Sequence, residues 1–128
     1  MSVPGLPRVG PEAFEGRRLR SRGTVAVAFL ADWCPFCRDF APEFAALAPT
    51  PGLELEVADL TSLESPLWER FEVEIVPTVV VFADGEAVFR ADGVAGEGLG
   101  AEALEGVRQA ARSTAARSAS ASRRSPGP

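Results

Sequence analysis

One unbroken apolar run constrains the fold of this chain more than any other feature. Thr24–Ala31 contains only valine, alanine, phenylalanine and leucine after its first residue. A strand that is apolar at every position is typical of a strand covered on both faces in a mainly parallel sheet, whereas a half-exposed strand alternates. We therefore expect a central strand here and an α/β architecture with helices on both faces of the sheet.

Helical and extended patterns alternate after this run. Apolar residues that follow Cys34 at spacings of four, four and three predict a helix, which Pro42 is expected to kink. Leu53–Asp59 mostly alternates between apolar and acidic side chains, which predicts a strand near an edge of the sheet. Asp84-Gly85 predicts a tight hairpin. The other expected elements are helices at Pro11–Arg20, Pro66–Val73 and Ala101–Arg112 and strands at Thr78–Phe82 and Ala87–Arg90.

The two ends of the chain are expected to lie outside the folded domain, which we place at residues 11–112. Met1–Gly10 is rich in proline and glycine, so we expect a flexible segment with a short strand at Leu6–Val9. Ser113–Pro128 has no apolar residue larger than alanine. Because such a segment has little to bury, we expect a disordered tail rich in arginine, serine and alanine.

Composition narrows the chemistry that this chain can perform. Its 128 residues include two cysteines, no histidine and no lysine. Histidine-based acid–base catalysis, Ser-His-Asp and Cys-His nucleophiles, and lysine Schiff bases are therefore excluded. The common zinc ligand sets and the phosphate-binding loop are missing as well, and we expect neither a metal nor another cofactor.

Hydropathy and charge indicate the compartment of the protein and the classes of partner that it can bind. No apolar run reaches the roughly 18 to 20 residues of a membrane-spanning helix, and the first residues lack the apolar region of a secretory signal. We therefore expect a cytoplasmic protein without a membrane partner. Residues 31–105 hold sixteen acidic residues against three arginines, while residues 106–128 hold five arginines and no acid. An acidic middle would repel nucleic acid, so no nucleic-acid partner is expected.

Cys34 and Cys37 are the residues best suited to chemistry. Their spacing at the start of a helix puts both sulfurs on one face and permits a small disulfide. The helix N-terminus stabilises a thiolate at Cys34, which would make Cys34 the attacking nucleophile and Cys37 the resolving thiol. Three less favoured interpretations stay open: a structural disulfide, half of a zinc site completed by carboxylates or a partner chain, and inert buried thiols.

The motif around the cysteines resembles the thioredoxin family. The resemblance covers roughly Pro11–Arg112 and rests on Trp33-Cys34-Pro35-Phe36-Cys37, Pro42, Val76-Pro77-Thr78, Asp84-Gly85 and Gly93. It implies a thioredoxin fold, an α/β arrangement in which helices flank both faces of a central mixed sheet of roughly four to five strands. It also implies a cis bond before Pro77 and pairing of the Val76 backbone with an extended substrate.

The same resemblance assigns substrate binding to Trp33, Val76, Pro77 and Thr78. We interpret Trp68, the second tryptophan, as a core residue.

This chain departs from the family's pattern at two places. Ala28 stands where the family has a buried carboxylate on the central strand, so the usual proton acceptor for Cys37 is missing. We expect Cys37 to lose its proton to water or Asp59, with slower turnover near neutral pH. Between the cysteines, Pro35 and Phe36 replace Gly-Pro, and because this dipeptide tunes the redox potential we expect an intermediate value.

The resemblance implies a thiol-disulfide oxidoreductase that reduces disulfides in protein substrates, with Cys34 and Cys37 as its catalytic residues. A thioredoxin-reductase-like enzyme or glutathione would restore the dithiol, and the protein is expected to be a monomer. Two alternatives stay open. One is a glutaredoxin-like thioltransferase coupled to glutathione, and the other is a non-catalytic binding module that uses the groove around Trp33, Phe36 and Pro77.

Overall fold

A five-stranded mixed sheet forms the centre of the molecule in the computed structural model, which describes the backbone of residues 1–124 and the side chains of residues 1–116. The sheet order is β1-β5-β4-β6-β7. β4 runs parallel to β5 and antiparallel to β6, and β1 extends the sheet beyond β5 in parallel. The strands are β1 Arg8–Val9, β4 Thr24–Leu30, β5 Leu53–Asp59, β6 Thr78–Ala83 and β7 Glu86–Asp92.

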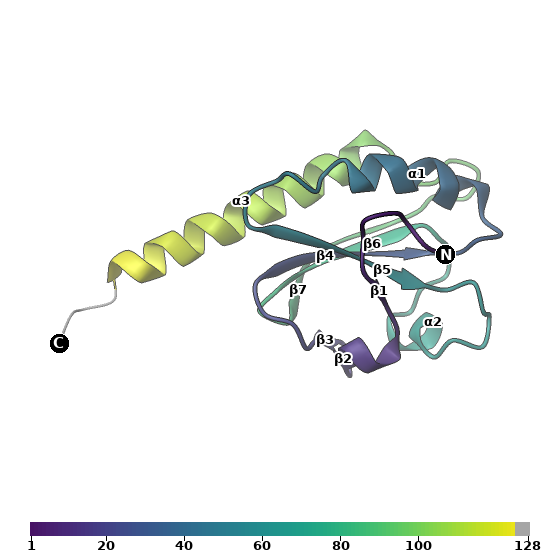
Figure 1. Cartoon of the computed structure of the whole chain (residues 1–128), viewed down its shortest axis with the longest axis horizontal. Coiled ribbons are helices and arrows are strands. Elements are labelled where there is room, and N and C mark those ends of the chain that lie inside the picture. The colour runs from purple at the N-terminus through teal and green to yellow at the C-terminus, as the bar shows by residue number, and fades with distance from the viewer. Residues whose placement is uncertain (125–128) are drawn as a thin grey trace.

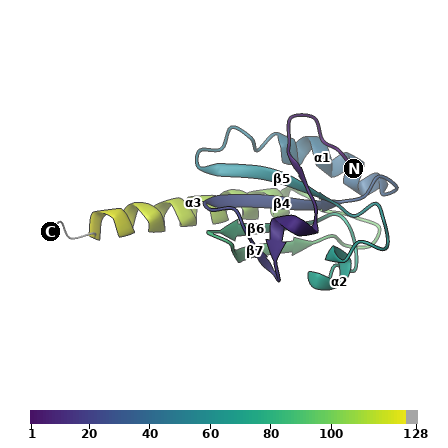
Figure 2. The same cartoon turned by 60° about the horizontal axis from the view of Figure 1, so that its bottom comes forward.

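The predicted mixed sheet with helices on both faces is confirmed. One face is covered by α1 (Pro35–Ala45) and α3 (Ala101–Arg124), and the other by α2 (Leu67–Arg70) and a small hairpin of β2 (Phe14–Glu15) and β3 (Arg18–Leu19), as Figures 1 and 2 show. Every residue of β4 is buried, as the apolar run predicts. β5 alternates as expected from Leu53 to Val57, but Ala58 is buried as well. The strand lies one position in from the edge, because the short β1 pairs with its outer side.

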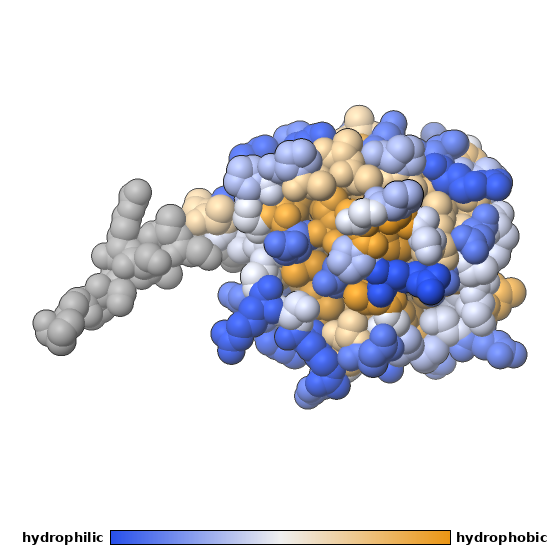
Figure 3. Space-filling view, in the orientation of Figure 1, coloured by the Kyte–Doolittle hydropathy of each residue, from blue (hydrophilic) through white to orange (hydrophobic). Residues whose placement is uncertain are grey.

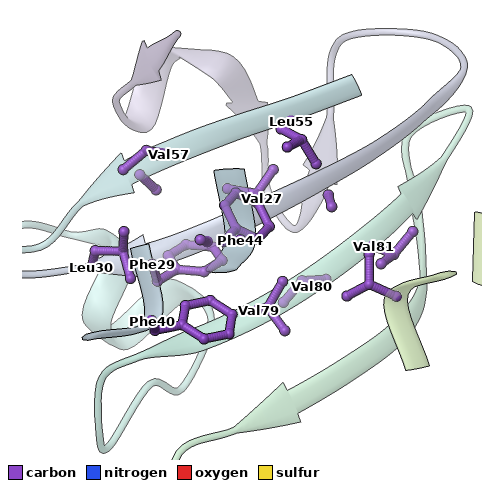
Figure 4. Packing of buried hydrophobic residues seen from close by; sticks show 14 of the residues in the cluster. Val27, Phe29, Leu30, Phe40, Phe44, Leu55, Val57, Val79, Val80 and Val81 are labelled. Carbon is purple, nitrogen blue, oxygen red and sulfur yellow. The ribbon is translucent and has the colours of Figure 1, made fainter. Parts of the chain in front are cut away.

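The core lies on both sides of the sheet. Phe40 and Phe44 of α1 are buried beside strands β4, β5 and β6, as Figure 4 shows. A second aromatic cluster contains Phe14, Phe29, Phe71 and Phe82, with ring centroids 4.9 to 6.3 Å apart. Hydrophobic residues also reach the surface between the two covering layers, where hydrophilic residues surround them (Figure 3).

The prediction of a helix at Pro11–Arg20 is wrong. Pro11–Ala13 forms a single 3-10 turn (η1), and the chain then makes the β2–β3 hairpin, in which Phe14 lies directly opposite Leu19. Both side chains are buried, but positions five apart lie on different faces of a helix and could not share one apolar stripe. Gly16 in the turn has a φ of +59°, a left-handed conformation that glycine adopts without steric cost.

The first ten residues, which we expected to be flexible, pack onto the sheet. Val3 is buried, and the Val57 amide donates to the Pro7 carbonyl over 2.9 Å. The strand expected at Leu6–Val9 is shorter, since only Arg8–Val9 pairs with β5.

The last helix is longer than expected. α3 begins at Ala101 as predicted but continues to Arg124. Residues 113–124, for which we expected a disordered tail, are therefore helical. Alanine and arginine are strong helix formers, and their frequency in this segment favours a helix. Residues 125–128 lie outside the described part of the chain.

Within residues 1–124, no helix is both long enough and apolar enough to cross a membrane.

Candidate functional site

Cys34 lies at the end of the short loop that connects β4 to α1. It is the N-cap residue of the helix, and its Sγ accepts a hydrogen bond from the Cys37 amide over 3.3 Å. Pro35 follows in the first turn, where its missing N–H has no helical partner to lose. The Cys34 thiol donates to the Val76 carbonyl over 3.4 Å, across 42 residues of chain. The fold thus brings the cysteine loop and the Val76-Pro77 segment together.

Cys37 lies one turn further along the same helix and is fully buried, whereas Cys34 retains 5% exposure. The Cys37 Sγ accepts a hydrogen bond from the Ala31 amide over 3.4 Å. Burial raises the pKa of the Cys37 thiol to about 12, because a thiolate there would lose its hydration, and the nearby Cys34 adds to this increase. Both cysteines are free thiols in this structure.

The opposite wall of the site is formed by the turn before β6. The Val76–Pro77 bond is cis, and both residues are buried. The Gly93 amide donates to the Pro77 carbonyl over 2.9 Å. A β-carbon on Gly93 would lie 2.7 Å from that carbonyl oxygen, so only glycine permits this approach.

Thr78 is also buried, and its side chain stabilises this turn by hydrogen bonds and does not face the solvent. Its hydroxyl donates to the Ile75 carbonyl over 2.8 Å and lies 3.3 Å from Asp92 Oδ1. Asp92 is thus a neighbour of the site that sequence reasoning missed, since only strand pairing places it opposite Thr78.

Trp33 is the large apolar side chain exposed next to Cys34, with 51% of its surface accessible. Its indole Nε1 donates to the Thr61 carbonyl over 2.9 Å. The ring stacks on Trp68, with centroids 6.2 Å apart and planes inclined by 10°. Trp68 in turn donates from Nε1 to the Ser62 carbonyl over 3.0 Å.

Trp68 is therefore only half buried and supports Trp33, which corrects the expectation that it is a core residue. Two tryptophans 35 residues apart in sequence carry no spacing signal that could have revealed this contact.

Thr61 connects Trp33 to a carboxylate. Its hydroxyl accepts from the Asp32 amide over 2.9 Å and donates to Asp59 Oδ1 over 2.6 Å. Asp59 also pairs with the terminal ammonium of Met1. Burial alone would raise the pKa of Asp59, but the hydrogen bonds from that ammonium and from Thr61 outweigh it and lower the pKa. Sequence reasoning named Asp59 but missed Thr61.

Phe36, between the two cysteines, is half buried against the loop that follows β7. A β-carbon on Gly98, which has a φ of +71°, would lie 2.9 Å from the Phe36 β-carbon. Ala28 is buried between Val57 and Val79 on the neighbouring strands, so this part of the central strand offers no proton acceptor. Among the described residues, no group of three or more histidine, cysteine or acidic side chains could hold a metal ion.

A cysteine pair at a helix start that follows a central strand, facing a proline turn, defines a redox-active class of site. Residues 7–105 match the sequence model of the thioredoxin family, described as "Thioredoxin". The chain belongs to the thioredoxin family.

Curated relatives agree with this assignment. A thioredoxin from Rhodospirillum rubrum is 33% identical over 82 residues, which cover 63% of this chain and 79% of the relative. A thioredoxin from Mycobacterium bovis is 34% identical over 91 residues, covering 70% and 78%. Protein disulfide-isomerase A4 from Bos taurus is 38% identical over 72 residues, covering 52% of this chain but only 11% of that much longer protein.

Solved structures support the fold. A thioredoxin variant from Halobacterium salinarum aligns with a TM-score of 0.65 and 27% identity, covering 89% of this chain and 95% of the other. Thioredoxin f from spinach chloroplast aligns with a TM-score of 0.66 and 20% identity, covering 84% and 86%, and this likeness concerns the fold alone.

Proposed function

We propose that this protein is a thiol-disulfide oxidoreductase that reduces disulfides in protein substrates by dithiol–disulfide exchange. The observation that carries the proposal is the position of Cys34, a free thiol at the N-cap of α1 whose sulfur accepts the Cys37 amide hydrogen bond. The N-terminus of a helix presents amide donors and the positive end of the helix dipole, which stabilise negative charge that develops there during a reaction. Cys34 is also the more accessible of the two sulfurs.

The proposed reaction has two steps. The Cys34 thiolate attacks one sulfur of the substrate disulfide, forms a mixed disulfide and releases the other substrate sulfur as a thiolate, which takes up a proton. Cys37 then loses its proton and attacks Cys34 Sγ, forming the Cys34–Cys37 disulfide and releasing the second substrate thiolate. Two electrons pass from the protein dithiol to the substrate.

The second step is the one that this chain makes difficult. A Cys37 pKa of about 12 leaves few thiolates at neutral pH, and Ala28 supplies no base. Asp59 is a weak proton acceptor because its pKa is lowered and its oxygen already accepts hydrogen bonds from Thr61. We therefore infer that water takes the Cys37 proton.

This inference predicts a pH dependence of the resolving step. Burial, the largest cause of the raised Cys37 pKa, persists when Cys34 is held in the mixed disulfide, so the thiolate fraction and the resolving rate should rise with pH throughout about pH 6 to 9. Acid quenching followed by mass spectrometry of the mixed disulfide measures this rate. A resolving rate that is flat across this range would contradict the inference.

The residues around the two sulfurs would bind the substrate and tune the redox potential. Trp33 offers an exposed apolar ring, while Val76 and Pro77 form the wall against which an extended substrate segment would lie. Thr78 is buried, so its role in substrate binding would be to position that wall. Pro35 and Phe36 would set the redox potential.

The protein would need a partner to restore the dithiol, either a thioredoxin-reductase-like enzyme or glutathione, and no cofactor of its own. We expect it to act as a monomer in a reducing compartment such as the cytoplasm, where free thiols persist.

The test uses the reduced full chain with bis(2-hydroxyethyl) disulfide and with a disulfide-bonded peptide. Cys34→Ser should abolish reduction of both. Cys37→Ser should complete only the first step and accumulate a mixed disulfide on Cys34, detectable by mass spectrometry. Reduction that requires glutathione in the wild type would indicate a glutathione-coupled thioltransferase. Full biological activity of the Cys34→Ser/Cys37→Ser variant would indicate a binding module.

A further inference from the structure

A groove beside Phe36 has no role in the chemistry described above. It encloses about 360 Å³ between α1 and the segment that leads into α3. Phe40 is buried in its floor, and Phe36 and Leu99 are half buried along it. Phe36, which separates the two cysteines in the sequence, lines the groove, although neither cysteine does.

The rim of this groove is acidic. Asp39 and Glu43 of α1 line one side, and Glu97 lines the other. All three carboxylates are exposed, and no residue in the described part of the chain forms an ion pair with them. Asp39 and Glu43 are four residues apart on one helix, a spacing at which like charges repel each other. A cation in the groove would relieve this repulsion.

We propose that this groove, which we call the acidic groove, binds an arginine or lysine side chain of the protein substrate, a few residues from its disulfide. The apolar floor matches the methylene stem of such a side chain, and the carboxylates match its charged end. The proposal rests on the proposed function and specifies its substrate class. The chain's own arginine-rich end is not the occupant, because α3 carries it away from α1 (Figures 1 and 2).

The test compares two disulfide-bonded peptides that are identical except for arginine or its neutral isostere citrulline beside the cysteines. The reduced full chain should react about three to ten times faster with the arginine peptide at low salt, since charge attraction raises association rates. At 0.5 M NaCl this ratio should fall towards one because exposed charges are screened.

Variants distinguish the effect of the groove's three carboxylates from the effect of the protein's overall negative charge. In Asp39→Asn/Glu43→Gln/Glu97→Gln the arginine-to-citrulline ratio should approach one, and Glu97→Gln alone should lower it about twofold. Glu54→Gln removes one exposed charge from β5 and should keep the wild-type ratio. Equal ratios in the wild type and the triple variant would overturn the proposal.

Two further results would have a different meaning from those above. Failure of the wild type to reduce the uncharged bis(2-hydroxyethyl) disulfide would overturn the proposed function itself. Concentration-dependent dimerisation that is lost on deleting residues 117–128 would show that the basic end of a second copy occupies the groove, and would overturn the substrate proposal. Analytical ultracentrifugation of both chains measures this.

Discussion

At the scale of single residues, Glu56 holds a carboxylate oxygen in an unfavourable position. Its Oε1 is buried and has no hydrogen-bond partner among the described residues. Burial raises the pKa of Glu56, and the nearby Glu54 carboxylate raises it further. A raised pKa in the folded protein means that folding favours the protonated form, so the ionised form is a source of instability at neutral pH.

We predict that Glu56→Gln stabilises the protein at pH 7, by up to about 1 kcal/mol. The gain should shrink as the pH falls towards about 4, because the wild-type carboxyl then becomes protonated and carries no charge to bury. Urea unfolding of both proteins at several pH values measures this difference. Glu54→Gln, at an exposed position, is the matched control and should gain less. A gain that does not depend on pH would contradict the electrostatic cause.

At the scale of elements, α3 packs on β7 through a glycine. A β-carbon on Gly106 would overlap the ring of Phe89, so glycine at this helix position admits the aromatic side chain. Glycine otherwise weakens a helix interior by about 1 kcal/mol relative to alanine. The sequence shows this local cost but not the packing that requires it.

Gly106→Ala should therefore lower the melting temperature, because displacing Phe89 costs about 1 to 3 kcal/mol and exceeds the gain in helix propensity. In a Phe89→Leu background, the same Gly106→Ala substitution should raise the melting temperature. Thermal unfolding of the four proteins completes a double-mutant cycle. Stabilisation of the otherwise unchanged chain by Gly106→Ala would refute the packing role of this glycine.

The stack of Trp33 on Trp68 is a second contact between elements, since it connects the loop before α1 to α2. Trp68→Leu should lose the stacking energy, about 0.5 to 1.5 kcal/mol, and leave Trp33 more mobile. Trp68→Phe retains an aromatic face and should lose less. Each variant has Trp33 as its single tryptophan, so acrylamide quenching of its fluorescence is a direct readout. Equal quenching in the two variants would contradict the supporting role of Trp68.

At the scale of the whole molecule, α3 extends well beyond the sheet that it covers (Figure 1). Among the α3 side chains that the structure describes, which end at residue 116, the buried ones run from Ala103 to Ala111. The contacts that fix this helix on the sheet therefore come from its first half.

Deleting residues 117–128 should change the free energy of unfolding by less than about 0.5 kcal/mol, because substitutions away from packed features have effects of this size. Reduction of bis(2-hydroxyethyl) disulfide should keep its wild-type rate. Chemical unfolding and far-UV circular dichroism, which should report fewer helical residues, test both statements. A stability loss above about 2 kcal/mol would mean that this end packs on the domain.

Local patterns in the sequence determined the central strand, the helix that starts at the cysteines and the family. The strand and the helix are each encoded within one short segment: an apolar run in Thr24–Ala31, and an i, i+3 cysteine pair before an apolar stripe. The family is recognised from several such short motifs along the chain. The spacing of Cys34 and Cys37 needs no other part of the chain to be recognised.

Tertiary structure alone decided which distant segments meet. It placed Val76 against Cys34 across 42 residues, stacked Trp68 on Trp33, and brought Glu97 opposite Asp39. It also formed a hairpin where a helix was expected, because Phe14 and Leu19 could both be buried only as a cross-strand pair. Such contacts depend on how separate elements share one core, and no periodicity along the chain records that choice.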